Sequence, residues 1–376
     1  MQCAYFSADR CRSCTHLQVP YAEQLNAKQR SAEQWLSPWA PEWLAPQASE
    51  EAYFRNKAKL VVAGRTGRVT LGILDRQQQG VDLTGCELHE RPLLDALPAL
   101  SRWINETGLT PYSVPGRQGE LKHVLLTVSP DAELALRFVM RSEAQLGRIR
   151  RGLDALRAAV PGIRAVSANI QPEHKAVLEG DREIGLGDEH RLPMRLGAVT
   201  LQLGHRSFFQ TNTRVTRALY ARASEWVLDG APSSVWDLFC GVGGFALHAA
   251  ARAGGSESLD IVGVEVSEDA IAGARLAAET AGVDARFVAG DATQMAARGE
   301  PVPDVVIVNP PRRGITSLAP WLNDSGAGRI IYSSCNPKSL QRDIEAMPRF
   351  RPARAQLFDM FPHTAHSEVL VELVRR

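Results

Sequence analysis

The sequence predicts an α/β protein whose C-terminal part holds a mostly parallel, Rossmann-like sheet. From about residue 206 onward, short apolar segments alternate with helical patterns, a rhythm typical of strand–helix–strand units. These apolar segments are hydrophobic throughout, which indicates strands covered on both faces. The last two, ARAQLFDM and EVLVELV, are joined by FPHTAHS, which is too short to hold a crossover helix. The final strand should therefore run antiparallel to its neighbour.

Length, charge and the N-terminus narrow the class of protein. The 376 residues suffice for two or three domains, each with its own core. Because 43 Lys and Arg residues nearly balance 42 Asp and Glu residues, any basic surface for nucleic acid must be local. No run of about 18 apolar residues predicts a membrane span, and MQCAYFSADRCRSC lacks the apolar core of a signal peptide. We therefore expect a cytoplasmic protein with no membrane partner and with reduced cysteines.

Residues 1–50 differ from the rest of the chain in composition. They are rich in Cys, Trp and Pro, and one helix is expected from Tyr21 to Leu36, because Pro38 and Pro41 prevent it from continuing. The changes of pattern along the chain predict three domains. These are an N-terminal segment at 1–50, a central domain at 51–205 and a catalytic domain at 206–376.

The central region is predicted to be an α+β domain. Two helices, around 90–106 and over 143–159, interrupt a series of short strands. In the second helix apolar residues recur at steps of three and four, and Ser142 and Gln145 are expected to form a capping box at its start. The expected strands are KLVVAG, LGILD, HVLLTVS, LALRFVMR, AVSANIQ and VTLQLG.

The first strands of the C-terminal region carry the features of a nucleotide site. VWDLF leads into a turn with Gly241, Gly243 and Gly244, where the backbone can approach a ligand closely. The next strand, IVGVE, ends in Glu265, and an acidic residue at this point accepts hydrogen bonds from ribose hydroxyls. A nicotinamide dehydrogenase shares both features, although Ala246 stands where its third glycine is expected. The remaining expected strands are ARFVAG, DVVIVN, RIIYSS, ARAQLFDM and EVLVELV.

Two further strand ends favour a methyltransferase. DVVIVN ends in Asn309-Pro310-Pro311, a rigid turn typical of enzymes that use S-adenosylmethionine (SAM). Asp291 ends the third strand, where it either faces an adenine ring or caps the following helix. With the antiparallel last strand, these features predict a class I SAM-methyltransferase fold, preceded by the α+β central domain and an N-terminal cysteine cluster.

Cys335 is the candidate nucleophile. It follows RIIYSS at the carboxyl end of the fifth strand, the edge that lines the ligand crevice in such sheets. Asn336 is expected to cap the next helix and Pro337 to begin it, so that the helix N-terminus lowers the pKa of the thiol. A buried structural cysteine is the alternative. Cys240 is a rival nucleophile, but it lies in the cofactor turn, where its backbone is the part expected to be used.

A thiolate at this edge suits methylation of uracil at carbon 5. Addition of the thiolate to carbon 6 makes carbon 5 nucleophilic, and a base must then remove the carbon 5 proton so that the sulfur can leave. The candidate bases are His363, His366 and Glu368. Glu368 is favoured because a carboxylate at the start of an apolar strand needs a partner or a role. Both histidines are expected to make structural hydrogen bonds.

Four segments resemble the RNA C5-uracil methyltransferase family: DLFCGVGGF, NPPRRG, IIYSSCN and FDMFPHTAHSEVL. The chain resembles the branch that modifies 23S rRNA over essentially its full length. The resemblance implies that Cys335 is the nucleophile and Glu368 the proton acceptor. It implies SAM contacts by Gln210, Phe239, Glu265 and Asn309, although Asn309 stands where other branches carry Asp. Arg312, after the double proline, separates the chain from amino-group methylases.

A cluster of cysteines is expected near the N-terminus. Cys3, Cys11 and Cys14 are spaced C-x7-C-x2-C, with Cys86 far downstream. Four thiolates suit zinc or an iron–sulfur cluster, and spacing alone does not choose between them or exclude unligated thiols. The family resemblance implies a [4Fe–4S] cluster. Four cysteines would fill every iron, so the cluster is expected to be structural rather than a site of radical chemistry.

The expected partner is 23S rRNA, bound by a monomer. Between Arg137 and Arg157 there are six arginines, which either contact phosphates or form a solvated surface. Further basic residues are Arg55, Lys57, Lys59, Arg312 and Arg313, and stacking on an extruded base is open to Tyr112, Phe208 and Phe209. Three alternatives stay open: a tRNA C5-uracil methyltransferase, an amino-group methylase, or a non-catalytic iron–sulfur protein that binds RNA.

Overall fold

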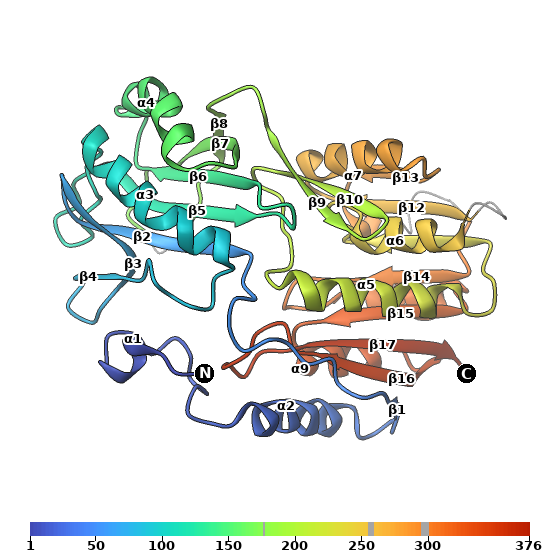
Figure 1. The fold of residues 1–376 in the computed structure, drawn as a ribbon. Helices are drawn as coiled ribbons and strands as arrows, with labels where there is room; N and C mark the ends of the chain where they lie inside the picture. The colour runs from blue at the N-terminus through green and yellow to red at the C-terminus, as the bar shows by residue number, and fades with distance from the viewer. Residues whose placement is uncertain (176, 255–258, 295–300) are drawn as a thin grey trace. The chain divides into compact units, whose positions relative to one another are not determined.

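The computed structural model describes residues 1–175, 177–254, 259–294 and 301–376, which form two compact units (Figure 1). Unit 1 comprises Met1–Cys14 and Glu51–Met194. Unit 2 comprises Thr15–Glu50 and Arg195–Arg376. The first 50 residues are thus divided after Cys14, rather than forming a segment of their own. The division arises because the helix after Cys14 packs its apolar residues, Ala32 and Leu36, into the core of unit 2.

Unit 1 is built on a seven-stranded sheet with the order β4-β3-β2-β5-β6-β7-β8. All neighbours pair antiparallel except β6 and β7, which are parallel and joined through helix α4. The strands are β2 (Lys57–Arg65), β3 (Arg68–Leu74), β4 (Gly80–Asp82), β5 (Leu121–Val128), β6 (Leu134–Met140), β7 (Ile163–Ile170) and β8 (Arg182–Gly185). The helices are α1 (Ala4–Ser7), α3 (Arg91–Thr107) and α4 (Leu146–Ala159).

One face of this sheet carries the core of unit 1. Residues at alternate positions of the strands, such as Val124 and Leu126 of β5, pack with Leu97 and Trp103 of α3 and with Ile149 of α4. The intervening strand positions therefore lie on the opposite face. That face carries polar and basic residues, including Lys57, Lys59, His123 and Arg137.

The predicted capping box of α4 is wrong. The helix begins at Leu146 and has no side-chain cap. The Ser142 hydroxyl donates to Glu120 Oε2 at 2.6 Å, while Gln145 bonds the backbone and side chain of Thr110. Both side chains therefore bond residues that are distant in the sequence, and neither caps the N-terminus of α4.

Unit 2 is built on an eight-stranded sheet with the order β1-β16-β17-β15-β14-β11-β12-β13. Strands β13, β12, β11, β14 and β15 are parallel, and β17 runs antiparallel to both β15 and β16, as predicted. The strands are β1 (Glu42–Trp43), β11 (Ser234–Leu238), β12 (Asp260–Glu265), β13 (Arg286–Ala289), β14 (Val305–Val308), β15 (Arg329–Ser334), β16 (Phe350–Phe358) and β17 (Glu368–Arg375). A separate hairpin pairs β9 (Arg191–Leu196) with β10 (Val199–Gly204).

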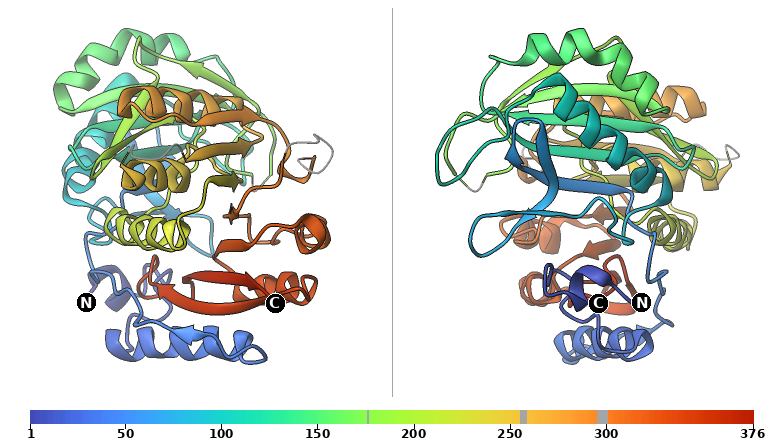
Figure 2. Two further views of the ribbon diagram at one scale, coloured as in Figure 1. Left: turned by 90° about the vertical axis from the view of Figure 1, so that its right-hand side faces the viewer. Right: turned by 60° about the vertical axis from the view of Figure 1, so that its left-hand side comes forward.

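Helices cover both faces of this sheet, as continuously apolar strands require. Helices α2, α8 and α9 contribute to one core with β11, β14 and β15, and Figure 2 shows α2 running along the strands β16 and β17. Helices α5 and α6 pack against each other, and α7 packs on β10 and β13. The bounds are α2 (Tyr21–Leu36), α5 (Thr213–Leu228), α6 (Gly244–Ala253), α7 (Glu268–Ala281), α8 (Leu318–Ser325) and α9 (Pro337–Glu345). Among the described residues, none of the helices is both long and apolar enough to cross a membrane.

Candidate active site

The carboxyl-terminal edge of the parallel strands gathers the predicted site residues of unit 2. Phe239, Asn309 and Cys335 each follow the last residue of β11, β14 and β15, and Glu265 ends β12. Glu368 begins β17, which runs antiparallel, so its first residue lies at the same edge; Val369 pairs with Ser334. The sheet order turns back between β11 and β14, the position at which open α/β sheets bind ligands.

The turn from β11 to α6 is built for close approach to a ligand. Phe239 has φ 64°, and Gly241 and Gly243 also have positive φ. A non-glycine residue in this region is strained, and such strain clusters at functional sites. Any Cβ at Gly244 would collide with the ring and hydroxyl of Tyr220, so the packed tyrosine requires glycine there.

Glu265 and Asp237 are held beside this turn in different ways. The Glu265 carboxylate accepts hydrogen bonds from the backbone N–H groups of Gly241 (3.3 Å) and Ser267 (3.1 Å). Asp237 is fully buried and accepts one bond, from the Ala246 N–H at 3.0 Å. Its other oxygen has no partner within the described part of the chain, and burial raises the pKa of Asp237 to about 7. A buried acceptor of this kind suits a donor on a ligand. Asp237 lies within β11, and no feature of the sequence singled it out as a ligand contact.

Asp291 and Gln210, the two other residues expected near the cofactor, lie outside the glycine turn. Asp291 accepts a hydrogen bond from the Thr293 N–H at 2.9 Å, so it caps the turn that follows β13. Gln210 is buried in the segment that leads to α5, where the Asn212 side chain accepts from the Val215 N–H at 3.2 Å.

Cys335 is half-buried at the end of β15, and its thiol differs from the expectation. Burial, together with the negative charge of Glu368, raises the pKa of Cys335, and the nearby Arg312 only partly opposes them. The predicted lowering by the N-terminus of α9 is therefore wrong. The cap is also different: Asn336 precedes α9, but its side chain donates to the Arg312 carbonyl at 2.9 Å instead of capping the helix. This bond ties the Pro311–Arg312 turn to the end of β15.

Glu368 is a buried carboxylate with one hydrogen-bond donor beside it. The Ser333 hydroxyl donates to Glu368 Oε1 at 2.5 Å. Burial raises the pKa of Glu368 to about 7, and the Ser333 bond partly opposes the shift. A group with this pKa can accept or release a proton near neutral pH. Ser333 was not expected from the sequence; the available signal was the pair of hydroxyls, Ser333 and Ser334, at the end of the strand that leads to Cys335.

The rival nucleophile Cys240 is unsuited to thiolate chemistry. It is buried, and burial together with Asp237 and Glu265 raises the pKa of its thiol well above the ordinary value. Its backbone N–H donates to the Val264 carbonyl at 3.1 Å.

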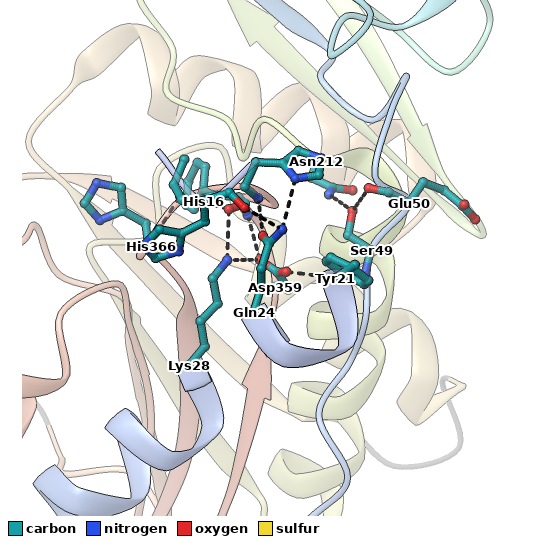
Figure 3. A network of polar contacts seen from close by, with 12 residues as sticks. His16, Tyr21, Gln24, Lys28, Ser49, Glu50, Asn212, Asp359 and His366 are labelled. Carbon is teal, nitrogen blue, oxygen red and sulfur yellow. Dashed lines mark hydrogen bonds and ion pairs between the residues drawn. The ribbon is translucent and has the colours of Figure 1, made fainter. Parts of the chain in front are cut away.

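A buried polar network fastens the N-terminal helix α2 to the loop that precedes Glu368 (Figure 3). Lys28 Nζ lies 2.7 Å from Asp359 Oδ1, and both side chains are at most 2% exposed. Lys28 also donates to the Phe361 carbonyl at 2.9 Å, and Tyr21 donates to Asp359 Oδ2 at 3.0 Å. No sequence signal pointed to this network, because a lysine on an amphipathic helix usually indicates a solvated face.

The two histidines of this loop are placed differently. His363 is fully buried; its backbone N–H donates to Gln24 Oε1 at 2.8 Å, and its Nδ1 lies 3.2 Å from Gln24 Nε2. This agrees with the expected structural hydrogen bonds. His366 is largely exposed, with Nδ1 3.4 Å from Arg312 Nη2; the partial loss of solvent around its ring, together with the charge of Arg312, lowers the pKa of the imidazole.

The four cysteines expected to bind metal lie together in unit 1. A cavity of about 130 Å³ is lined by Cys3, Cys11, Cys14 and Cys86. Burial and the other three thiols raise the pKa of Cys14 to about 11. In the part of the chain that the structure describes, no three His, Cys, Asp or Glu side chains converge closely enough to hold a single metal ion.

The arginines expected to contact RNA fall into two groups. Arg137 forms ion pairs with Glu179 and Glu183, and Arg141 pairs with Glu120, so their charges are already compensated. The four on α4 are Arg148, Arg150, Arg151 and Arg157. Of the aromatic candidates, Phe208 is 69% exposed and Phe209 is buried.

Comparison with known proteins gives two partial and several full-length similarities. A family described as tRNA (Uracil-5-)-methyltransferase matches residues 302–376, and a general methyltransferase domain matches residues 235–312. The 23S rRNA (uracil(747)-C(5))-methyltransferase RlmC of Serratia proteamaculans is 46% identical over 100% of both chains. The protein of the same name from Halothiobacillus neapolitanus is 45% identical, also over 100% of both chains.

A solved structure extends the similarity to three dimensions. The Pyrococcus abyssi tRNA (uracil-54, C5)-methyltransferase, in complex with S-adenosyl-L-homocysteine, superposes with a TM-score of 0.78. The two are 25% identical, and the match covers 96% of this chain and 85% of the archaeal chain.

Proposed function

Because this chain belongs to the family of RNA (uracil-C5)-methyltransferases, we propose that it transfers the methyl group of SAM to carbon 5 of a uridine in 23S rRNA. The full-length relatives named for uracil 747 of 23S rRNA support this target over tRNA. They also argue against an amino-group methylase and against a non-catalytic RNA-binding protein. We further propose that it acts in the cytoplasm and that it is a monomer. Light scattering on the purified protein tests the monomeric state.

The observation that carries the proposal is the common edge shared by Cys335 and Glu368. One follows β15 and the other begins the neighbouring β17, at the same edge of the sheet as the glycine turn after β11. After burial, the charge of Glu368 is the next cause of the raised pKa of Cys335, so the carboxylate lies within electrostatic reach of the thiol. A nucleophile and a base at one edge are what methylation of a pyrimidine carbon requires.

The reaction divides into two halves on these side chains. The Cys335 thiolate bonds to carbon 6 of the uracil, and the ring electrons shift to carbon 5. When bound, SAM supplies an electrophilic methyl group that carbon 5 can accept. Glu368 then takes the proton from carbon 5, the carbon 6–sulfur bond breaks, and the thiolate returns.

The order of proton movements depends on the two pKa shifts. Burial is the larger cause of the raised pKa of Cys335, and a neutral Glu368 removes the second, electrostatic cause, so the thiol can lose its proton to solvent. Once sulfur is bonded to carbon 6 it carries no charge, so Glu368 can then release its own proton to solvent without facing a second anion. The carboxylate is thereby available as a base for the carbon 5 proton.

The residues around the glycine turn fit a SAM molecule. Glu265, steadied by two backbone N–H groups, is placed to accept the ribose hydroxyls. The unpaired oxygen of Asp237 is suited to a cationic donor such as an amino group. Phe239 and Asn309 border the same edge, and Gln210 is proposed as a further contact from the segment before α5.

A test uses a 23S rRNA fragment containing the target loop, labelled SAM, and nucleoside mapping of the product. Wild-type enzyme should yield 5-methyluridine at one position. Cys335→Ala should be inactive and form no adduct, whereas Glu368→Gln should accumulate RNA bound covalently to Cys335, visible on a denaturing gel. Label in any nucleoside other than 5-methyluridine would defeat the proposal, and an adduct with Cys335→Ala would remove Cys335 from its role.

We also propose that the four cysteines of unit 1 hold a [4Fe–4S] cluster. All four thiols line one cavity, and four cysteine thiolates are the ligand set of a [4Fe–4S] cluster. Iron and sulfide analysis of anaerobically purified protein tests this. Cys86→Ser should lower the bound iron, and stoichiometric zinc without sulfide would contradict the proposal.

A further inference from the structure

We propose that unit 1 contains a second RNA site, a pocket that receives one unpaired nucleobase other than the reacting uridine. The pocket is a cavity of about 410 Å³, within the size range of small-molecule sites. Its walls include Val61 of β2, Lys122 and His123 of β5, Tyr112, His174 and Leu178. The inference rests on the proposed function in one respect, that the substrate is RNA.

A β-bulge aims two consecutive side chains into this pocket. Leu121 pairs with Met140, but His123 pairs with Val139, so Lys122 is an extra residue in β5. Successive residues of a regular strand point to opposite faces, yet Lys122 and His123 both line the cavity. Bulges are enriched beside functional sites because they redirect side chains in this way.

The Tyr112 ring is held in place at both ends. Its hydroxyl lies 2.9 Å from His174 Nδ1, and Lys122 Nζ lies 4.8 Å from its ring centroid. Lys122 is itself buried and bonded to the Gln171 side chain and to the Glu173 carbonyl, the latter at 2.7 Å. A ring fixed before the ligand arrives loses little entropy on binding, so it makes an efficient stacking surface.

The remaining surroundings favour the flat face of a base over a phosphate group. Val114 and Val177, on the same cavity wall, are 36% and 50% exposed and are among the few large apolar side chains left in contact with water within the described residues. Burial and Lys122 lower the pKa of His123 to about 4, so its ring is uncharged at neutral pH. Lys175 is paired with Glu173 at 3.0 Å. Single-stranded RNA is commonly read by stacking on such rings, with nearby polar groups at the base edge.

The test compares Tyr112→Ala, which removes the ring, with Tyr112→Phe, which keeps it. Filter binding measures the Kd for the 23S rRNA fragment with S-adenosyl-L-homocysteine present, so no chemistry is needed. Loss of one base–aromatic stack weakens binding by about 5- to 100-fold, which is expected for Tyr112→Ala. Tyr112→Phe should stay within about threefold of wild type.

An abasic scan of the fragment identifies the captured base. Removing one particular base, distinct from the methylated uridine, should weaken wild-type binding and leave Tyr112→Ala unaffected. If Tyr112→Ala unfolds early in a thermal melt, Tyr112→Leu, which keeps an apolar side chain but removes the ring, gives the same comparison. Equal Kd values for wild type and the variant without a ring would overturn the pocket, as would equal losses at every abasic position. A wild-type enzyme that binds the fragment but makes no 5-methyluridine would instead count against the proposed function.

Discussion

Glu368 is a buried carboxylate at the start of an apolar strand, and its buried position opposes its proposed role as a base. The base must be ionised to take the carbon 5 proton, but burial favours the neutral form. The Ser333 hydroxyl, at 2.5 Å, offsets part of that cost. The site therefore operates close to the pH at which this one residue titrates.

The pH dependence of the reaction should reflect the titration of Glu368. Single-turnover methylation should rise with pH through about 7, because Glu368 must lose its proton. Ser333→Ala should move that rise to higher pH, since the hydroxyl lowers the pKa of Glu368. Ser334→Ala is the matched control, because its hydroxyl bonds Asn336 and not Glu368. Identical profiles for wild type and Ser333→Ala would show that another group controls the rate.

Folding stability should show the opposite trend with pH. The folded state raises the pKa of Glu368 from 4.5 to about 7, so its contribution is fully present below 4.5 and is lost as pH rises through about 7. The shift corresponds to roughly 3 kcal/mol. Glu368→Gln should remove this loss, and urea unfolding at pH 5 and pH 8 should show a smaller decrease for the variant than for wild type.

The position of Cys335 could be predicted from the sequence, but the pKa of its thiol could not. Its place at the end of β15 was predicted correctly from the apolar segment before it and the Asn-Pro after it. The direction of its pKa shift was wrong. A helix N-terminus stabilises an anion by only about 0.3–1 kcal/mol at exposed sites, and here burial and the charge of Glu368 outweigh it.

Helix α2 is the element whose role the sequence concealed. Its bounds, Tyr21–Leu36, agree with the prediction, because Pro20 and Pro38 lie just outside a clear amphipathic pattern. Its function in the fold depends on Lys28, which reaches Asp359, a residue 331 positions away. A pairing over that distance leaves no local trace in the sequence.

The ion pair of α2 should be costly to break. Lys28→Met leaves the Asp359 charge buried, which typically costs about 3–5 kcal/mol, and the double variant Lys28→Met/Asp359→Asn should cost less than the two single changes together. Because Asp359 precedes the loop that leads to Glu368, kcat should fall more than SAM affinity. Urea unfolding and single-turnover rates measure both effects. Arg214→Ala is the control, since its ion pair with Glu50 is exposed and worth at most about 1 kcal/mol.

Strand β1 is one of the elements that the sequence did not indicate. It has two residues, Glu42 and Trp43, which pair in parallel with Arg354 and Ala355 of β16. So short a strand has no periodicity of its own and exists because the sheet edge offers hydrogen-bonding partners. Its pairing adds the segment after α2 to the catalytic sheet.

At the scale of the whole molecule, the chain forms two cores from interleaved segments. Residues 1–14 belong with 51–194, and residues 15–50 belong with the catalytic unit. The cysteines and the proposed base pocket lie in unit 1, whereas Cys335, Glu368 and the glycine turn lie in unit 2.

Ligands should therefore stabilise the units separately. S-adenosyl-L-homocysteine at 100 times its Kd should stabilise unit 2 by about 2.7 kcal/mol. Hydrogen exchange should then slow in the strands of unit 2, such as β11 and β14, and stay unchanged in β5 and β6 of unit 1. In Cys86→Ser, loss of the proposed cluster should speed hydrogen exchange in β5 and β6 of unit 1 and leave β11 and β14 of unit 2 unchanged. Equal changes in both units would show that they unfold as one.

Local sequence patterns were enough to predict the α/β fold class, the strands β11 to β17 of the catalytic sheet, the antiparallel final strand and the family of the chain. These depend on local patterns, such as apolar runs, turn residues and the motifs at strand ends, which a linear sequence records directly. Only the folded chain reveals the raised pKa values of Cys335 and Glu368, the ion pair that holds α2 through Lys28 and Asp359, and the cavity that four distant cysteines share. Burial and charge depend on which residues become neighbours after folding, and those neighbours lie far apart along the chain.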